Sequence, residues 1–308
     1  MNHVLVRRMA HVGLVITVSA ALFAACGGGS STNAPTTTRV KNAALPTTTL
    51  EGDEGTTETS VEDTTPDTSE APTVTEAPTV TEAPLPTANQ APLSAGQDGD
   101  AFGGAVVVSA DGSTLAVGSL NSKSNQGSVT VFGRSAGKWV QQEVLADANG
   151  AAKDWFGYSM AISKDGNTLA IGAVYADVAG KVDQGNVLVF TRSGSAWTLQ
   201  ETLIGKSGAA GDVFGVSVAL SSDGNTVAVG AAGADVGNVS DQGSASVFVR
   251  SGAKWSMQQV LTVTGGETKA NYGSSLSLSS DGDTLAVGGP NAGKGSVVVF
   301  SRANGTWS

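Results

Sequence analysis

The sequence has very little histidine and cysteine. Its 308 residues include two histidines, His3 and His11, and one cysteine, Cys26. Everything after Cys26 therefore lacks both residue types. That region cannot form a Ser-His-Asp triad, a thiolate nucleophile, a histidine or cysteine zinc site, or a disulfide bond. These absences exclude several classes of catalytic and metal site.

Clusters of positive charge are also lacking. The chain has 17 basic and 27 acidic residues and a net charge of −10, and its lysines and arginines after residue 90 are scattered. Nucleic-acid binding needs a basic patch that neutralises phosphates. We therefore expect no nucleic-acid partner.

Residues 1–25 have the pattern of an export signal. Two arginines precede an apolar run from Val12 to Ala25, which is too short to span a bilayer comfortably. The stretch LFAAC, ending at Cys26, resembles the bacterial lipoprotein signal, with Phe23 where that family usually has leucine. The resemblance implies that Cys26 is acylated and anchors the exported protein in the cell membrane, facing outside. The alternative is ordinary signal cleavage that leaves Cys26 free.

Residues 26–88 are rich in threonine, proline and glutamate and nearly lack large apolar residues. The tandem EAPTVTEAPTVTEAP, Glu70 to Pro84, is typical of them. Such a segment buries too little surface to offset the entropy lost on ordering. We interpret it as a disordered stalk between the membrane and a folded domain at residues 89–308.

One phrase occurs four times in residues 89–308. It is written SADGSTLAVG from Ser109, SKDGNTLAIG from Ser163, SSDGNTVAVG from Ser221 and SSDGDTLAVG from Ser279. In each copy an Asp-Gly pair separates two alternating apolar runs, which is a strong hairpin signal because a tight primed turn needs positive φ. A phrase that recurs at near-constant spacing indicates a repeated structural unit.

Each unit contains four apolar runs of strand length. The third unit shows them as FGVSVALS from Phe214, TVAVGA from Thr226, SASVFVR from Ser244 and WSMQQVL from Trp255. One face of the first two runs carries small residues, such as Ser217, Ala228 and Gly230, whereas the outer two runs carry a phenylalanine and a tryptophan that recur in every unit. Side-chain volume that tapers inward predicts the blades of a β-propeller, with these aromatic residues packing between blades.

The units resemble a known family. The FG or YG pair at each start, the VG after the second run and the G-x-V-x-V-F of the third are similar to the FG-GAP repeat of integrin α-subunit propellers and many bacterial surface proteins. The resemblance covers about residues 96–308. It implies an all-β propeller of about four four-stranded blades and a role in extracellular recognition or adhesion.

The acidic residues of the repeats do not predict a calcium cage. Integrin-type blades often carry D-x-D-x-D-G between the first two strands, whereas this chain has one carboxylate there, and calcium needs six to eight oxygens. A weaker metal candidate pairs Asp177 with Asp183 and Asp235 with Asp241. Because the other units lack this pair, we favour carboxylates that cap loop amides. We expect no cofactor.

The ends of the repeat region suggest how a ring could close. The first three units finish with W-x-x-Q-x-x-L, the fourth reaches only Trp307 and Ser308, and Gln90 and Leu93 precede the first unit at the matching spacing. We predict that the segment around Gln90 to Leu93 supplies the outer strand of the fourth blade. An open arc or a truncated chain is the alternative, since this family more often has six or seven blades.

These observations favour a binding module over an enzyme. We expect a lipid-anchored propeller that meets an extracellular protein or glycan, with residues that break the repeat, Lys153, Trp155, Tyr158 and Tyr175, as candidate ligand contacts. A propeller glycosidase is less favoured because no acidic pair breaks the pattern to act as acid and nucleophile. A structural envelope protein without a dedicated ligand is the third alternative.

The anchor hypothesis makes the first testable prediction. Replacing Cys26 with serine removes the only acylation site and should release the protein from the membrane fraction into the soluble fraction. Cell fractionation followed by immunoblotting measures this. Unchanged membrane association of Cys26→Ser would show that something other than Cys26 holds the protein there.

Overall fold

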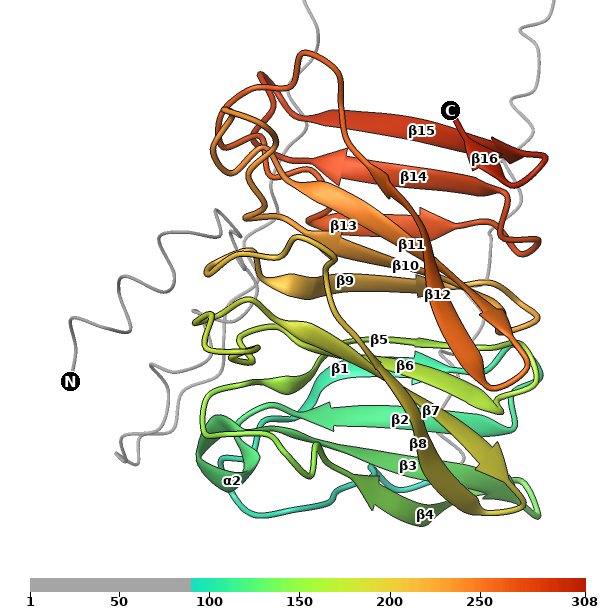
Figure 1. Ribbon diagram of the computed structural model, residues 1–308. Helices are drawn as coiled ribbons and strands as arrows, with labels where there is room; N and C mark the ends of the chain where they lie inside the picture. Colours follow the sequence, from blue (N-terminus) through green and yellow to red (C-terminus); the bar gives the residue numbers. More distant parts are fainter. Residues whose placement is uncertain (1–89) are drawn as a thin grey trace, which may run out of the picture. The chain divides into compact units, whose positions relative to one another are not determined.

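The computed structural model describes residues 90–308, which form four separate four-stranded antiparallel sheets (Figure 1). The predicted signal, Cys26 and the predicted stalk lie outside the described residues. In every sheet the strands follow sequence order. The structure confirms an all-β fold with four propeller-type blades. Within residues 90–308, no helix has the length and apolar character needed to cross a membrane.

The first three blades have strands of matching length, whereas in the fourth blade β13 has 4 residues and β16 has 2. The first blade contains β1 (Phe102–Val108), β2 (Thr114–Ser119), the single turn α2 (Ser122–Asn125), β3 (Ser128–Ser135) and β4 (Lys138–Leu145). The second contains β5 (Phe156–Ile162), β6 (Thr168–Ala173), β7 (Asn186–Ser193) and β8 (Ala196–Leu203). The third contains β9 (Phe214–Leu220), β10 (Thr226–Ala231), β11 (Ser244–Ser251) and β12 (Lys254–Leu261). The fourth contains β13 (Ser275–Leu278), β14 (Thr284–Gly289), β15 (Ser296–Ala303) and β16 (Thr306–Trp307).

The Asp-Gly phrase forms the turn between the first two strands of each blade. In the first copy, the Ser109 hydroxyl donates to Asp111 Oδ1 (2.5 Å), which also accepts the Ser113 amide (2.9 Å). The Thr114 amide donates to Ser109 Oγ (3.0 Å), and Gly112 takes a φ of 68°. The hydrogen bond from Ser109, followed by that from the Ser113 amide, holds the pKa of Asp111 below its usual value. The aspartate is thus a turn residue.

Glycine on the second strand lets the next blade approach at backbone distance. A Cβ on Gly230 would overlap the carbonyl oxygen of Gly273, the FG-type glycine of the following blade. Gly172 meets Gly215 in the same way, and a Cβ on Gly118 would lie 2.7 Å from the carbonyl oxygen of Gly157. Real Cβ atoms do not come this close to a carbonyl oxygen, so the repeat needs glycine here.

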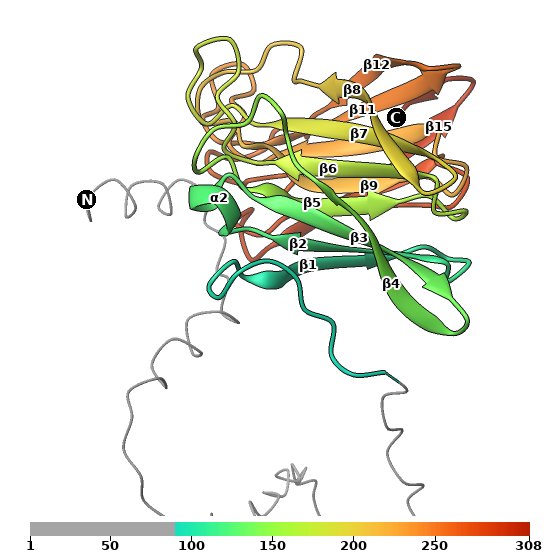
Figure 2. The same cartoon turned by 90° about the horizontal axis from the view of Figure 1, so that it is seen from below.

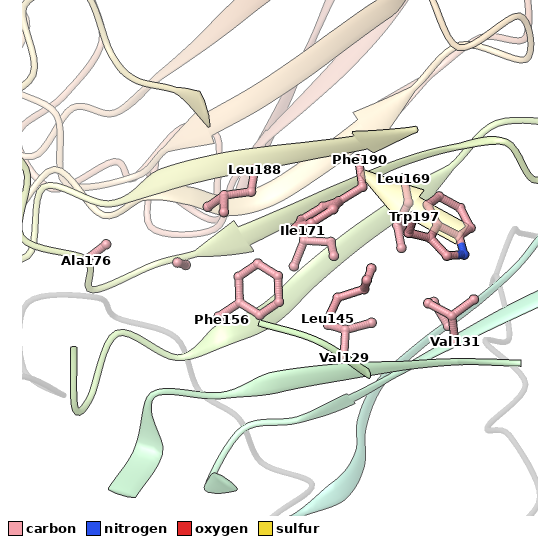
Figure 3. Close-up of a cluster of buried hydrophobic side chains, with 12 residues drawn as sticks. Val129, Val131, Leu145, Phe156, Leu169, Ile171, Ala176, Leu188, Phe190 and Trp197 are labelled. Carbon is pink, nitrogen blue, oxygen red and sulfur yellow. The ribbon is translucent and has the colours of Figure 1, made fainter. Parts of the chain in front are cut away.

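Large side chains fill the wider outer part of each junction. Between the first two blades, Val129, Val131 and Leu145 of the first face Phe156 and Trp197 of the second (Figure 3). The recurring phenylalanine and tryptophan of the second and third blades, together with Trp307, are buried. An arginine lies over the outer-strand tryptophan of every blade, with its guanidinium 5.3 to 5.9 Å from the ring centroid. The aromatic residues therefore pack the blades, as their one-per-blade recurrence predicts.

The expected closure by the segment around Gln90 to Leu93 is wrong. These residues form no strand, and the fourth sheet contains only β13 to β16. Gln90 instead contacts the first blade: its Nε2 donates to the Trp139 carbonyl (3.2 Å), and its Oε1 accepts the Trp139 amide (2.8 Å). Within residues 90–308, extensive strand contacts join each blade only to its neighbour in sequence. The physical reason is that no extensive contact among the described residues joins the first and fourth blades, so Gln90, which lies beside the first blade, does not pair with β15.

The two ends of the blades differ in loop length. One end carries the short hairpins, with turns such as 109–113 and 136–137, whereas the other carries longer connections such as 174–185, 204–213 and 232–243. In Figures 1 and 2 the longer loops gather with α2 on the left. We call this the loop end. Functional residues of repeat folds concentrate on such loops because the strands hold them in place.

The glycine contact yields a stability prediction. Gly230→Ala should lower the free energy of unfolding by about 3 kcal/mol, because the new methyl group meets backbone atoms that cannot move aside. Chemical denaturation measures the change. Gly133→Ala is the matched control, since its Cβ would meet only the flexible end of Gln142. Equal effects at both positions would contradict the close-approach account.

Candidate recognition surface

Three of the four candidate ligand contacts come together at the loop end. The rings of Trp155 and Tyr158 are stacked with centroids 6.0 Å apart, and Tyr175 meets Trp155 edge to face at 5.2 Å. All three side chains are half-buried. They pack against a small buried cluster that includes Val213 and Val216 of the next blade. We call Trp155, Tyr158 and Tyr175 the aromatic cluster.

The aromatic cluster occurs in one blade only. A backbone hydrogen bond that recurs in all four blades defines the equivalent positions: the Tyr175 amide donates to Asp154 O, as the amides of Asn121, Gly233 and Asn291 donate to the matching carbonyls. None of the residues matching the cluster is aromatic in the other blades: Ala101, Gly104 and Asn121; Val213, Val216 and Gly233; Asn271, Ser274 and Asn291. Blade packing alone therefore does not require three aromatic rings here.

Lys153 lies in the same loop as Trp155 but outside the ring contacts. Its side chain is exposed, and its backbone has a φ of 78°. Within residues 90–308 it makes no hydrogen bond or ion pair. Lys153 is therefore an unpaired positive charge two residues before Trp155 in the sequence.

The paired aspartates cap the long loops of the second and third blades. Asp177 Oδ1 accepts the backbone amide of Asp183 (2.9 Å), and Asp235 Oδ1 accepts that of Asp241 (2.8 Å). The second member of each pair then contacts the next blade, since its carbonyl accepts the amide of Val213 (3.2 Å) or Asn271 (3.1 Å). Among the described residues, no three His, Cys, Asp or Glu side chains form a group that could hold a metal ion. The pairs have the geometry of loop caps that fasten neighbouring blades.

A pocket of about 250 Å³ opens on the third blade, between the connection 204–213 and the loop 232–243. Its lining includes Lys206, Asp212, Phe214 and Asp235. Asp212 is buried, and its Oδ2 accepts the Ala209 amide (2.7 Å). Burial raises the pKa of Asp212, the Ala209 hydrogen bond opposes this, and nearby Asp235 raises it further. The pocket thus has an apolar wall and a carboxyl group with a reduced tendency to ionise.

Asp212 is a residue of this surface that the repeat pattern alone does not single out. It belongs to a D-x-F-G sequence that also places Asp100 and Asp154 two residues before the unit start. Each of the three accepts a backbone amide three residues earlier at 2.7 Å. The shared position signals a turn, whereas the pocket beside Asp212 arises from loop packing that the sequence does not encode locally.

Comparison with protein families identifies the repeat. The family model described as the FG-GAP repeat matches residues 139–190 and 197–248. This chain carries FG-GAP repeats. Each matched FG-GAP segment begins at the tryptophan of an outer strand and ends at the phenylalanine of the third strand in the next blade. The family repeat therefore spans a junction between two blades.

Solved structures also resemble the FG-GAP blades. One is titled Kuenenia stuttgartiensis hydrazine synthase, with 18% sequence identity, a TM-score of 0.44 and an alignment covering 67% of this chain and 48% of that chain. The matched region thus spans about half of that protein's length. A search of curated protein sequences gave no significant match.

The aromatic cluster yields a pH prediction. Burial, followed by the neighbouring Tyr175, raises the pKa of Tyr158 to about 12, against about 10 for free tyrosine. Because the pKa of Tyr158 is higher in the folded chain than in the unfolded chain, its neutral side chain stabilises the fold fully below pH about 10. This contribution is lost as the pH rises towards 12. Tyrosinate absorbance should show a step near pH 12 that is absent from Tyr158→Phe, with circular dichroism as a check on folding. If Tyr158→Phe instead removes an ionisation step near pH about 10, the ordinary tyrosine value, then Tyr158 is not buried as described.

Proposed function

We propose that this protein is a lipid-anchored binding module at the cell surface, and that the loop end around the aromatic cluster recognises an extracellular protein or glycan. FG-GAP propeller architecture supports a protein-binding role in general. The proposal adds the surface location and this particular contact region. It involves no catalysis and no cofactor.

One observation carries the choice of contact region. Three aromatic side chains gather in one blade of four, on the end with the longer loops, and each remains half-buried. Tryptophan and tyrosine dominate binding energy at protein interfaces because they provide large contact area at low entropic cost. Their rings also present flat apolar faces on which a sugar can stack. The pocket lined by Asp212 offers polar contacts nearby, since Val213, the next residue, packs against the aromatic cluster.

The sequence before residue 90 supports the surface location. An acylated Cys26 followed by a Thr-rich and Pro-rich stalk would hold the blades away from the membrane, where a large partner can reach them. The excess of acidic residues would keep the domain from adhering to anionic lipid. Both features suit recognition beyond the cell's own surface.

The experiment compares ligand capture by the full chain and a Trp155→Ala variant. A glycan array tests sugars, and capture from extracts of neighbouring cell surfaces, identified by mass spectrometry, tests proteins. Trp155→Ala should weaken binding of any captured ligand about thirtyfold, because it removes the ring that contacts both tyrosines. Titration with the purified ligand measures the change.

Val140→Ala is the matched control. Val140 is an exposed apolar residue on the outer strand β4, away from the long loops, so its truncation should leave affinity unchanged. A ligand that binds Trp155→Ala as tightly as the unmodified chain would overturn the assignment of the aromatic cluster. Failure of every array and extract to yield a ligand would favour the structural alternative.

A further inference from the structure

The two terminal blades expose opposite halves of one repeated junction. Val297 and Val299 on β15 are 66% and 59% exposed, whereas the matching Val129 and Val131 on β3 are fully buried by the second blade. On the first blade, Val106 and Val108 are 62% and 52% exposed, whereas the matching residues of later blades are half-buried or less. The fourth blade thus shows the surface that normally receives a following blade, and the first shows the surface that normally docks.

The backbone contacts of the junction are also unfilled at both ends. Gly157, Gly215 and Gly273 each lie against the preceding blade, but the equivalent Gly103 has no atom within 4 Å of its Cβ position. Gly288 matches Gly118, Gly172 and Gly230, yet the three atoms nearest its Cβ position all belong to Ser275 of its own blade. Gly288 therefore presents the second-strand surface that a following blade would approach, and Gly103 presents the FG-type backbone that would approach a preceding blade.

The polar contacts repeat this complementarity. Ser159 Oγ donates to the Gly215 carbonyl (2.7 Å) and Ser217 Oγ to the Gly273 carbonyl (2.6 Å). Ser275 occupies the same position in the fourth blade and is exposed. At the hairpin end, Thr114, Thr168 and Thr226 are buried under the Asp-Gly turn of the next blade, whereas Thr284 is exposed.

Gln90 already occupies the place of a preceding blade's outer strand. At the other junctions, Glu143 accepts the amide of Trp197 (2.9 Å), Glu201 that of Trp255 (2.8 Å), and Gln259 that of Trp307 (3.1 Å). Gln90 accepts the Trp139 amide at 2.8 Å, and, like Gln259, its Nε2 also donates to the tryptophan carbonyl. A blade that docks against the first blade would therefore place its outer strand beside the segment that begins at Gln90.

We propose that this neighbour is the fourth blade of a second copy of the chain. The exposed faces of the first and fourth blades are the two halves of an interface that the chain builds three times internally, so a second copy supplies a matching half at each end. Two copies of four blades would form one ring of eight, within the range of four to eight typical of propellers. A head-to-tail contact that closes on itself leaves no open sheet face.

The proposed junction has a definite contact set. Val106 and Val108 of one copy cover Val297 and Val299 of the other, and Gly103 lies against Gly288. The Ser275 hydroxyl then donates to the Gly103 carbonyl, as Ser159 and Ser217 donate within the chain. The ring would also bring two aromatic clusters to the same loop end. The inference stands independently of the proposed function, because it depends only on the terminal blades.

Sedimentation equilibrium of the full chain carrying Cys26→Ser, in the absence of detergent, tests the proposal. We expect twice the mass of one chain. Val299→Asp and Val106→Asp should each raise the dissociation constant at least about a hundredfold, because each buries two unpaired carboxylates in the ring. Both side chains are exposed in a single copy, so circular dichroism and thermal melting should show folded chains.

Val140→Asp is the control, since this exposed residue on β4 faces no blade in the proposed ring. It should keep twice the mass. If either aspartate variant fails to fold, Val299→Thr and Val106→Thr replace it and should shift the dissociation constant in the same direction. A single-chain mass at every concentration would overturn the proposal and indicate that other segments or further blades cover these faces. Association that resists one of the two substitutions, or that yields more than two copies, would overturn it as well.

Discussion

The fold depends on the close approach between an FG-type backbone and the glycine of the preceding blade's second strand. At three junctions a carbonyl oxygen lies too close to the position of a Cβ for any residue but glycine, so the inner strands of neighbouring blades meet backbone to backbone. At the same three junctions, the backbone amide of the aromatic residue before the FG-type glycine donates to the preceding blade, as Phe214 does to Gln184 O (2.8 Å). Because the inner edges are so close, the outer strands must diverge, and phenylalanine, tryptophan and arginine fill the space between them.

The same constraint separates structural residues from residues available for binding. Turn aspartates, junction glycines and outer aromatic residues recur in every blade because each junction needs them. The long loops also contribute to docking, since Asp183 and Asp241 present carbonyls to the next blade. Trp155, Tyr158 and Tyr175 contact one another but have no counterparts in the other blades. Their departure from the repeat is what makes them candidates for recognition.

Much of this architecture can be predicted from the sequence because the repeat averages over four copies. The Asp-Gly turns, the four strands per blade and the inward taper of side-chain volume all follow from local pattern, and the gathering of Trp155, Tyr158 and Tyr175 agrees with their shared departure from it. The position of Gln90 could not be predicted this way. Its spacing to Leu93 matches an outer strand, but which blade it joins depends on the path of the chain in space. The pocket at Asp212 likewise depends on two segments, the connection 204–213 into the third blade and the loop 232–243 within it, whose packing no local pattern specifies.

Backbone amide hydrogen exchange at the junctions tests the central claim most directly. The amides of Phe156, Phe214 and Tyr272 cross from one blade to the next. If close backbone approach unites the blades, these amides should exchange only through global unfolding, at the same slow rate as amides inside β6 and β10. Exchange at the rate of exposed loop amides, while β6 and β10 stay protected, would show that the blades are stable individually and that the junctions do not hold the fold together.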